Sequence, residues 1–429
     1  MNRALQLGTW LAGLHPDDIP SASADKAAEH YLDTLGAIVA GAGQPVARIA
    51  RDTFTAPGPC RLFLGPTAQR DAVDAARINA AAAHALEIDD TEGLDHSGAV
   101  VVPAILALDD QLGGIGMRQQ HTALVAGYEI GRRVQSSLGG YAAHNAAGWH
   151  STATCGVFAA AAAAGVILGL DAQRMASALG IAASLSAGGW AFSASGAMTK
   201  QLHPAFASGN GMLAARLAAA GATGPPQIFD DDVWGGFYAT HGAVGADPAQ
   251  LTEGIGERWA FNHSAIKPYA TCRSAHSAID ALREALDSGK LSPQSIRKIT
   301  IRLDPYLLPM IGQFATEPPS QARMSLPVAL ALALNGSALL PGDYSPQRLT
   351  ECGKWLRHMH VVADHSLAGG EPWLRVETSH GPMDLHHPFA SGGAHAPLGR
   401  AQVVAKFRAL TNGLLPAQKQ DSLIGAALG

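Results

Sequence analysis

The sequence predicts a mainly α protein with a large helical domain and a second, smaller α+β domain. Two observations support this prediction. Alanine-rich stretches recur from residue 24 to residue 220, and alanine is the strongest helix former. Between residues 265 and 390 the pattern changes, because segments such as IRKITIRLDPY alternate apolar and polar residues with the period of a β-strand. We expect a helical domain at residues 1–264 plus 391–429 and an α+β domain at residues 265–390.

Length and composition indicate a globular protein with a large interior. The 429 residues are 47% hydrophobic and 15% charged, and this length predicts about two domains. A net charge of −5 argues against binding to nucleic acid or an anionic membrane. The chain shows no signal sequence or membrane span, and its four cysteines lack metal or disulfide spacing, which together predict a cytoplasmic protein. These cysteines are Cys60, Cys155, Cys272 and Cys352.

The N-terminal region reads as a series of helices interrupted by one polar loop. Helices are expected at residues 24–42, at residues 71–85 and, in a shorter form, after Pro103. The loop HALEIDDTEGLDHSGAVVVP leads back into an apolar helix. Its residues 89–91 could be the solvated end of a helix, and His96 alone could be an ordinary loop histidine. Both alternatives stay open from the residues alone.

The most apolar stretch, from Gly148 to Leu170, begins with His150. Ser151 and Thr152 are good N-cap residues, so a helix is expected to begin near Thr152. Everything after Cys155 is small or apolar, and a helix without a polar face must be buried by its neighbours. Its N-terminal end, beside His150, would suit an anionic ligand.

A further helix is expected at residues 171–187, followed by a loop and then by Lys200 and His203. Residues three apart share one face of a helix. Pro204, however, predicts that only one turn precedes a new helix that begins near Ala205. A lysine in such an apolar segment either reaches for water or is held for an anion.

In the α+β region, Lys267 and Arg273 precede an amphipathic helix. Strands are expected at 296–306 and within HMHVVADHSL and EPWLRVETSHG, and helices within SLPVALALALNG and SPQRLTECGKWLRHM. The last helix, GRAQVVAKFRALTNGLL, resembles the first region and is expected to return to the helical domain. Histidines at positions 358, 360, 386 and 387 lack an obvious third ligand, so no metal site is predicted.

The polar stretches each lie where an apolar helix begins or ends. If they converge, they form a basic, partly desolvated pocket for a substrate with several carboxylates. Their order along the chain resembles the MmgE/PrpD family over nearly the whole length, on the segments EIDDT, LDHSGAVVVPAILAL, GWHSTATCGVFAAAAAA, LGLDAQRMASALGIAAS, AMTKQLHPAFASGNG, TGPPQIF and IKPYATCRSAHSAID. The resemblance implies an all-helical domain, an α+β lid domain, a homodimer, and action on a small polycarboxylate without metal or organic cofactor.

Matching the family's motifs residue by residue implies that the active site lies at Thr91, His96, His150, Lys200 and the segment 267–273. There are three departures from the family pattern. Glu87 stands where an aspartate is usual, Cys272 stands where decarboxylase-type members have a histidine, and Val328 stands where they have a tyrosine. The loss of the histidine and the tyrosine puts decarboxylation in doubt.

The chemistry available is removal of a proton next to a carboxylate. Histidine suits proton transfer near neutral pH, so His96 and His150 are expected to be the acid/base pair, with Lys200 binding a carboxylate and stabilising negative charge. Expected substrate-binding residues are Glu87, Thr91, Lys267, Cys272 and Arg273.

Dehydration of a 2-methylcitrate-like hydroxy acid is the predicted reaction. The alternatives are an epimerase or isomerase of a dicarboxylate such as iminodisuccinate, a cis-aconitate-type decarboxylase, and a non-catalytic helical binding protein.

Overall fold

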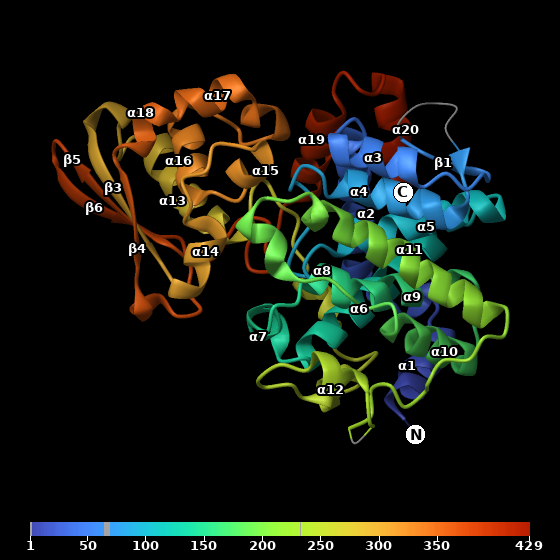
Figure 1. Cartoon of the computed structure of the whole chain (residues 1–429). Helices are drawn as coiled ribbons and strands as arrows, with labels where there is room; N and C mark the ends of the chain where they lie inside the picture. Colours follow the sequence, from blue (N-terminus) through green and yellow to red (C-terminus); the bar gives the residue numbers. More distant parts are fainter. Residues whose placement is uncertain (1, 64–68, 232) are drawn as a thin grey trace. The chain divides into compact units, whose positions relative to one another are not determined.

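The structure is a computed structural model that describes residues 2–63, 69–231 and 233–429 (Figure 1). The predicted mainly α fold is confirmed. The chain forms two compact units. The helical unit comprises residues 1–85, 89–265 and 399–429, and the α+β unit comprises residues 86–88 and 266–398. That the α+β unit acts as a lid stays a prediction.

The helical unit is built around one buried helix, α9 (Gly156–Ile167). Every residue of α9 except Val166 is buried, as the lack of a polar face predicts. Small residues let its neighbours approach closely: a Cβ added at Gly211 would lie only 2.4 Å from the carbonyl oxygen of Val157. The other helices are α1 (Arg3–Ala12), α2 (Ser21–Gly41), α3 (Pro45–Thr53), α4 (Ala72–Ala83), α5 (Ser97–Leu112), α6 (Met117–Ser137), α7 (Gly140–Ala146), α8 (Ser151–Thr154), α10 (Ala172–Ala183), α11 (Thr199–Ala219), α12 (Phe237–His241), α19 (Arg400–Thr411) and α20 (Ala417–Leu428), with a short antiparallel pair β1 (Cys60–Arg61) and β2 (Gln69–Arg70).

Two helices run through prolines that were expected to interrupt them. Helix α5 begins at Ser97 rather than after Pro103, and α11 begins at Thr199 and contains Pro204. A proline inside a helix costs about 3 kcal/mol because it removes a hydrogen bond and crowds the preceding turn. Both helices are largely buried against α4 and α9, and tertiary packing of this kind outweighs the local cost.

The expected helix near Thr152 is divided in two. The N-cap is His150, one turn of α8 follows, and the chain bends at Cys155 before α9 begins. The hydroxyl of Ser186 donates to the carbonyl of Thr154 at 2.9 Å, which gives that carbonyl a partner from outside the helix. His150 therefore lies at a short turn, and not at the end of a long helix with a large dipole.

The α+β unit contains a four-stranded sheet in the order β4 (Met359–Ala363), β3 (Ile296–Leu303), β5 (Trp373–Thr378), β6 (Gly381–Leu385). Strand β3 is parallel to β4 and antiparallel to β5. Strand β6 was not predicted, and it completes a hairpin with β5. Ile299, Ile301 and Leu303 alternate inward along β3. The helices of this unit are α13 (His276–Asp287), α14 (Leu308–Ile311), α15 (Pro319–Ala322), α16 (Leu326–Leu334), α17 (Pro346–Glu351) and α18 (Gly353–Leu356).

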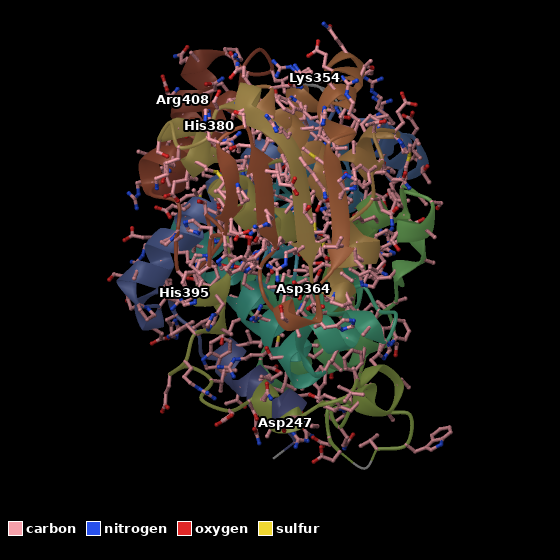
Figure 2. The ribbon with its side chains drawn as sticks, turned by 90° about the vertical axis from the view of Figure 1, so that its left-hand side faces the viewer. Asp247, Lys354, Asp364, His380, His395 and Arg408 are labelled. Carbon is pink, nitrogen blue, oxygen red and sulfur yellow. The ribbon has the colours of Figure 1, made fainter. Side chains whose placement is uncertain are left out.

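Figure 2 looks onto the sheet of this unit, with His380 in the β5–β6 turn and Asp364 after β4 at opposite ends. Half-exposed positions of this sheet carry ion pairs, such as that between Arg375 and Asp384. Among the helices of the described segments, none combines the length and apolar composition that a membrane span requires.

Candidate active site

The three predicted catalytic residues come together inside the helical unit. His96 is the N-cap of α5, His150 is the N-cap of α8, and Lys200 lies in the first turn of α11. Their exposed fractions are 4%, 0% and 8%, so all three groups are removed from bulk water. Four more buried polar side chains join them, namely His84, Asp89, Asp95 and His203. We call these seven residues the buried centre.

Asp95 lies between the two histidines that were expected to transfer protons. Its Oδ1 lies 3.5 Å from Nε2 of His96, and its Oδ2 lies 3.4 Å from Nε2 of His150. The hydroxyl of Thr152 also donates to Oδ2 at 3.2 Å. The anion beside the start of α8 is therefore a carboxylate of the protein itself.

Charge at the centre favours the ionised form of Asp95. Burial raises the pKa of the Asp95 carboxyl, but the charges of His96 and Lys200 and a hydrogen bond from His150 outweigh burial and hold that pKa well below its usual range. The ring centroids of His96 and His150 are 6.5 Å apart.

His150 also has a histidine partner on α11. Nδ1 of His150 and Nδ1 of His203 are 2.7 Å apart, so one of the two nitrogens donates a proton to the other. Burial lowers the pKa of both imidazoles, that of His203 to about 3. The backbone N–H of His150 donates to the carbonyl of Gly188 at 3.0 Å, and this bond fixes the backbone from which the imidazole projects.

Lys200 is connected to His96 through two residues of the polar loop. Its Nζ donates to Nε2 of His84 at 3.1 Å. Nδ1 of His84 lies 3.0 Å from Oδ2 of Asp89, and Nδ1 of His96 lies 2.9 Å from the same oxygen. Burial and the charge of Lys200 lower the pKa of His84 to about 4, so its imidazole is neutral near pH 7.

The polar loop is buried, and the solvated helix end considered for residues 89–91 is wrong. Asp89 and Asp90 have no exposed surface, and Thr91 is 5% exposed. Oδ1 of Asp90 accepts from the N–H of Gly98 at 2.8 Å, which satisfies one of the free donors at the start of α5. A Cβ at Gly98 would lie 2.3 Å from Oγ1 of Thr34, so this close packing requires glycine.

The same loop carries unusual backbone conformations. Glu87, Glu92 and Asp95 have φ values of 56°, 59° and 129°, a region that side chains other than glycine rarely adopt. Such residues persist only where surrounding contacts determine them, and they cluster at functional sites. The loop is therefore held in a conformation that serves the position of its side chains.

Thr91 is fixed by its backbone. Its N–H donates to the carbonyl of Ala265 at 2.8 Å, and its carbonyl accepts from the N–H of Ala265 at 2.7 Å. These two bonds hold Thr91 in place without using its hydroxyl. A role for that hydroxyl in orienting a substrate stays a prediction.

The remaining predicted residues belong to the α+β unit. Lys267 is buried, and its Nζ donates to Oε1 of Glu87 at 3.1 Å and to the Glu87 carbonyl at 3.0 Å. Arg273 donates to a carboxylate oxygen of Glu371, whose other oxygen accepts from Ser277 at 2.7 Å. Arg273 opens a short 3-10 helix (Arg273–Ala275).

Cys272 and Val328, the two departures from the decarboxylase-type pattern, also lie in this unit. Cys272 is 8% exposed and is the N-cap of the 3-10 helix at Arg273. Val328 is fully buried in the first turn of α16. Val328 has no proton to transfer, and Cys272 offers a thiol where decarboxylase-type members have an imidazole.

Four members of the buried centre were not singled out as site residues from the sequence: His84, Asp89, Asp95 and His203. Some signals were present. Asp95 directly precedes His96, and His203 lies one helical turn after Lys200. The contacts of His84 with Lys200 and of His150 with His203 join residues 116 and 53 positions apart, and no local pattern encodes them.

Three groups of the centre, His84, Asp89 and His96, are close enough to surround a metal ion. Their hydrogen bonds account for this spacing, because both imidazole Nδ1 atoms approach one carboxylate oxygen at 3.0 and 2.9 Å. The ammonium of Lys200 also bonds His84, and a positive charge at this position opposes a second cation. The expectation of a metal-free site stays a prediction.

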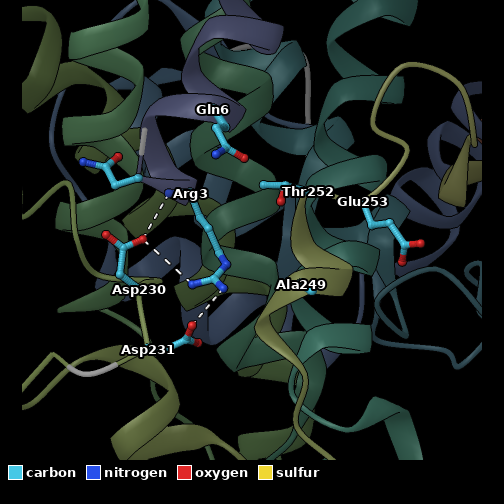
Figure 3. A pocket seen from close by; sticks show the side chains of 8 residues that line it. Arg3, Gln6, Asp230, Asp231, Ala249, Thr252 and Glu253 are labelled. Carbon is cyan, nitrogen blue, oxygen red and sulfur yellow. Dashed lines mark hydrogen bonds and ion pairs between the residues drawn. The ribbon is translucent and has the colours of Figure 1, made fainter.

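A different pocket, of about 730 Å³, opens on the surface of the helical unit (Figure 3). Figure 3 shows Arg3 pointing toward Asp230 and Asp231, and its guanidinium makes an ion pair of 3.0 Å with Asp231. Because carboxylates already surround the arginine, this pocket is poorly suited to a substrate with several carboxylates. It contains none of the predicted site residues.

The fold and the buried centre define a mainly α protein of two units in which histidines, carboxylates and a lysine share one desolvated site. Two family models match the chain: the MmgE/PrpD N-terminal domain matches residues 5–247, and the MmgE/PrpD C-terminal domain matches residues 269–428. The second match includes residues 399–428, which belong to the helical unit. The chain belongs to the MmgE/PrpD family.

Curated relatives carry the name of an enzyme. The chain is 29% identical to cis-aconitate decarboxylase of Aspergillus terreus (strain NIH 2624 / FGSC A1156), over 94% of this chain and 87% of the relative. It is 27% identical to the cis-aconitate decarboxylase-like protein oryM of Aspergillus oryzae, over 100% and 94%. It is also 27% identical to human cis-aconitate decarboxylase, over 79% and 72%.

Proposed function

We propose that this protein is an enzyme that removes a proton next to a carboxylate of a small polycarboxylate without a cofactor, and that its reaction is dehydration of a 2-methylcitrate-like hydroxy acid. One observation carries the proposal. Two buried histidines face the two oxygens of Asp95, and a buried lysine belongs to the same hydrogen-bonded centre.

Dehydration needs a base for the carbon-bound proton and an acid for the departing hydroxyl. His150 and His96 supply these two groups in the proposal. The neutral imidazole of His150 is the base, because burial lowers its pKa and leaves it unprotonated near pH 7. Both nitrogens of His96 approach carboxylate oxygens, an arrangement that suits an imidazolium and hence a proton donor.

Removal of a proton next to a carboxylate places negative charge on that carboxylate. Lys200 is proposed to bind it, because an ammonium group in a desolvated site stabilises developing charge more strongly than it would in water. Glu87, Thr91, Lys267, Cys272 and Arg273 stay proposed substrate-binding residues. The homodimer and the cytoplasmic location also stay proposals.

Decarboxylation is the second candidate, because two of the relatives named above carry the name cis-aconitate decarboxylase. Against it, Cys272 and Val328 occupy the positions at which the resemblance implies a histidine and a tyrosine. Epimerisation is a third candidate, since it shares the first step and differs only in where the proton returns.

The test is product analysis with purified protein and separate samples of 2-methylcitrate, citrate, cis-aconitate and aspartate-derived dicarboxylates. Proton NMR in deuterated buffer, together with a separate CO₂ assay, distinguishes the candidates. Dehydration produces an alkene signal with loss of the hydroxy acid, decarboxylation releases CO₂, and epimerisation exchanges a carbon-bound proton for deuterium without loss of water. Turnover in none of these assays would favour the non-catalytic alternative.

A further inference from the structure

His84 is the member of the buried centre that contacts Lys200 directly. It is the C-cap of α4, and its side chain has no exposed surface. Its Nε2 accepts from Nζ of Lys200 at 3.1 Å, and its Nδ1 lies 3.0 Å from Oδ2 of Asp89. The His84 imidazole therefore connects Lys200, in the first turn of α11, with Asp89 in the polar loop.

Hydrogen-bond chemistry fixes the tautomer of this ring. An ammonium group has only donors, so Nε2 of His84 must present its lone pair to Lys200. A carboxylate only accepts, so the proton of the neutral imidazole must sit on Nδ1, facing Asp89. The low pKa of His84 supports the neutral form. Asp89 thus orients the ring, as a carboxylate behind a catalytic imidazole does elsewhere.

A neutral acceptor has a specific consequence for the lysine. A lysine side chain is long and flexible, and one rigid bond to an imidazole restricts where its ammonium can lie. Because His84 is neutral, this bond orients the ammonium without cancelling its charge. The same oxygen of Asp89 accepts from Nδ1 of His96 at 2.9 Å, so one carboxylate fixes both the lysine's partner and a proposed proton donor.

We propose that His84, held by Asp89 as the Nδ1–H tautomer, is a positioning residue that aims the Lys200 ammonium at a carboxylate of the substrate. This inference rests on the proposed function, because it assumes that Lys200 binds a carboxylate. It adds a residue to that site and gives a reason for the buried histidine–aspartate pair.

The first test measures binding, and needs no turnover. Tricarballylate, a saturated tricarboxylate, is titrated calorimetrically against the full-length protein and its variants. We expect His84→Leu to weaken binding about tenfold, the effect of losing one well-placed charged contact. His84→Gln retains an acceptor oxygen for Lys200 and should recover most of the affinity. His121→Leu is the matched control, because His121 lies on α6 against the ring of Tyr31.

A double variant separates positioning from general damage. If His84 acts through the lysine, adding His84→Leu to Lys200→Ala should change the dissociation constant by less than about twofold. An equal loss with and without Lys200, or a silent His84→Leu beside a damaging Lys200→Ala, would overturn this inference alone. Wild-type binding by Lys200→Ala would overturn both this inference and the proposed role of the lysine.

A spectroscopic readout covers the case in which His84→Leu does not fold. Long-range ¹H–¹⁵N correlation of protein labelled at histidine reports the tautomer of each ring, and His84 is assigned from the signal that His84→Gln removes. The expected state of the wild-type protein is Nδ1–H. An Nε2–H ring could not accept from Lys200, and that result would overturn the proposal whatever the variants do.

Discussion

The two units hold their positive charges in different ways. In the helical unit, the ammonium of Lys200 donates to the neutral imidazole of His84. In the α+β unit, Lys267 and Arg273 donate to the carboxylates of Glu87 and Glu371. The Lys200 charge also acts on the Asp95 carboxylate, but its bond to His84 is to a neutral group. The bonds of Lys267 and Arg273 are to carboxylates, which cancel part of their charge. The comparison predicts that Lys200 contributes more to anion binding than the cations of the α+β unit.

The two units also differ in how many of their histidines are buried. The helical unit buries several imidazoles, whereas the α+β unit buries His276 but leaves His358, His360 and His380 exposed. Burial lowers the pKa of several histidines in the helical unit, to about 4 for His84, His121 and His144 and to about 3 for His203. The two units should therefore respond differently to acid.

The largest expected effect is a loss of stability in acid. Because the folded pKa values lie below the unfolded value near 6.5, the unfolded chain binds more protons, and stability falls as the pH drops from about 6.5 toward 4. Linkage gives roughly 1 kcal/mol per buried histidine between pH 7 and pH 5.5. Hydrogen exchange at stepped pH should show the helical unit losing protection first. Earlier loss of protection in the α+β unit would contradict this prediction.

Burial raises the pKa of Asp33, so the folded state binds this proton more readily than the unfolded chain does. The contribution of Asp33 to stability therefore changes with pH in the direction opposite to that of the buried histidines. Replacing one contributing histidine away from the buried centre should reduce the acid sensitivity. His121→Gln serves here, because burial lowers the pKa of His121. A melting temperature that varies with pH as steeply in this variant as in the wild type would exclude His121 as a contributor.

The second largest effect concerns proton transfer. Replacing His150 with glutamine removes a base, and general base catalysis contributes about 10²-fold or more, so kcat should fall by that factor with a modest change in KM. The variant should stay folded, because glutamine can still bond to its neighbours. Steady-state kinetics on the substrate found by product analysis, after a circular dichroism check, measures this. Wild-type turnover by this variant would show that His96 or another residue is the base.

How far the sequence could anticipate this site depends on whether contacts were local. The shared face of Lys200 and His203 follows from their spacing, and both side chains are buried in the structure. The position of His150 at a helix entrance was also predictable. The link between Lys200 and His84 was not, because it depends on how α4 and α11 pack. Local rules failed at Pro103 and Pro204 for the same reason: packing overrode the residue's own preference.

A third prediction compares the cations directly. Lys200→Ala should raise KM strongly, by about 30-fold, and lower kcat as well if the ammonium stabilises the transition state. Arg273→Gln should raise KM less, by about fivefold, because its charge is already paired with Glu371. Glu371→Gln is the matched control, since it removes the pairing carboxylate and should not raise KM. A larger rise in KM for Arg273→Gln than for Lys200→Ala would show that the arginine contributes more to anion binding than the lysine.

The smallest expected effect is that of chelation, for which the prediction is no change. His84, Asp89 and His96 lie close enough to hold a metal, but their mutual hydrogen bonds satisfy both Nδ1 atoms, and the Lys200 ammonium bonds the remaining nitrogen of His84. A divalent ion would have to replace these bonds beside a positive charge, which is unfavourable in a buried site. Activity should therefore survive exhaustive dialysis against EDTA. Loss of activity that a divalent ion restores would show that the centre holds a metal, and Lys200 would then need another role.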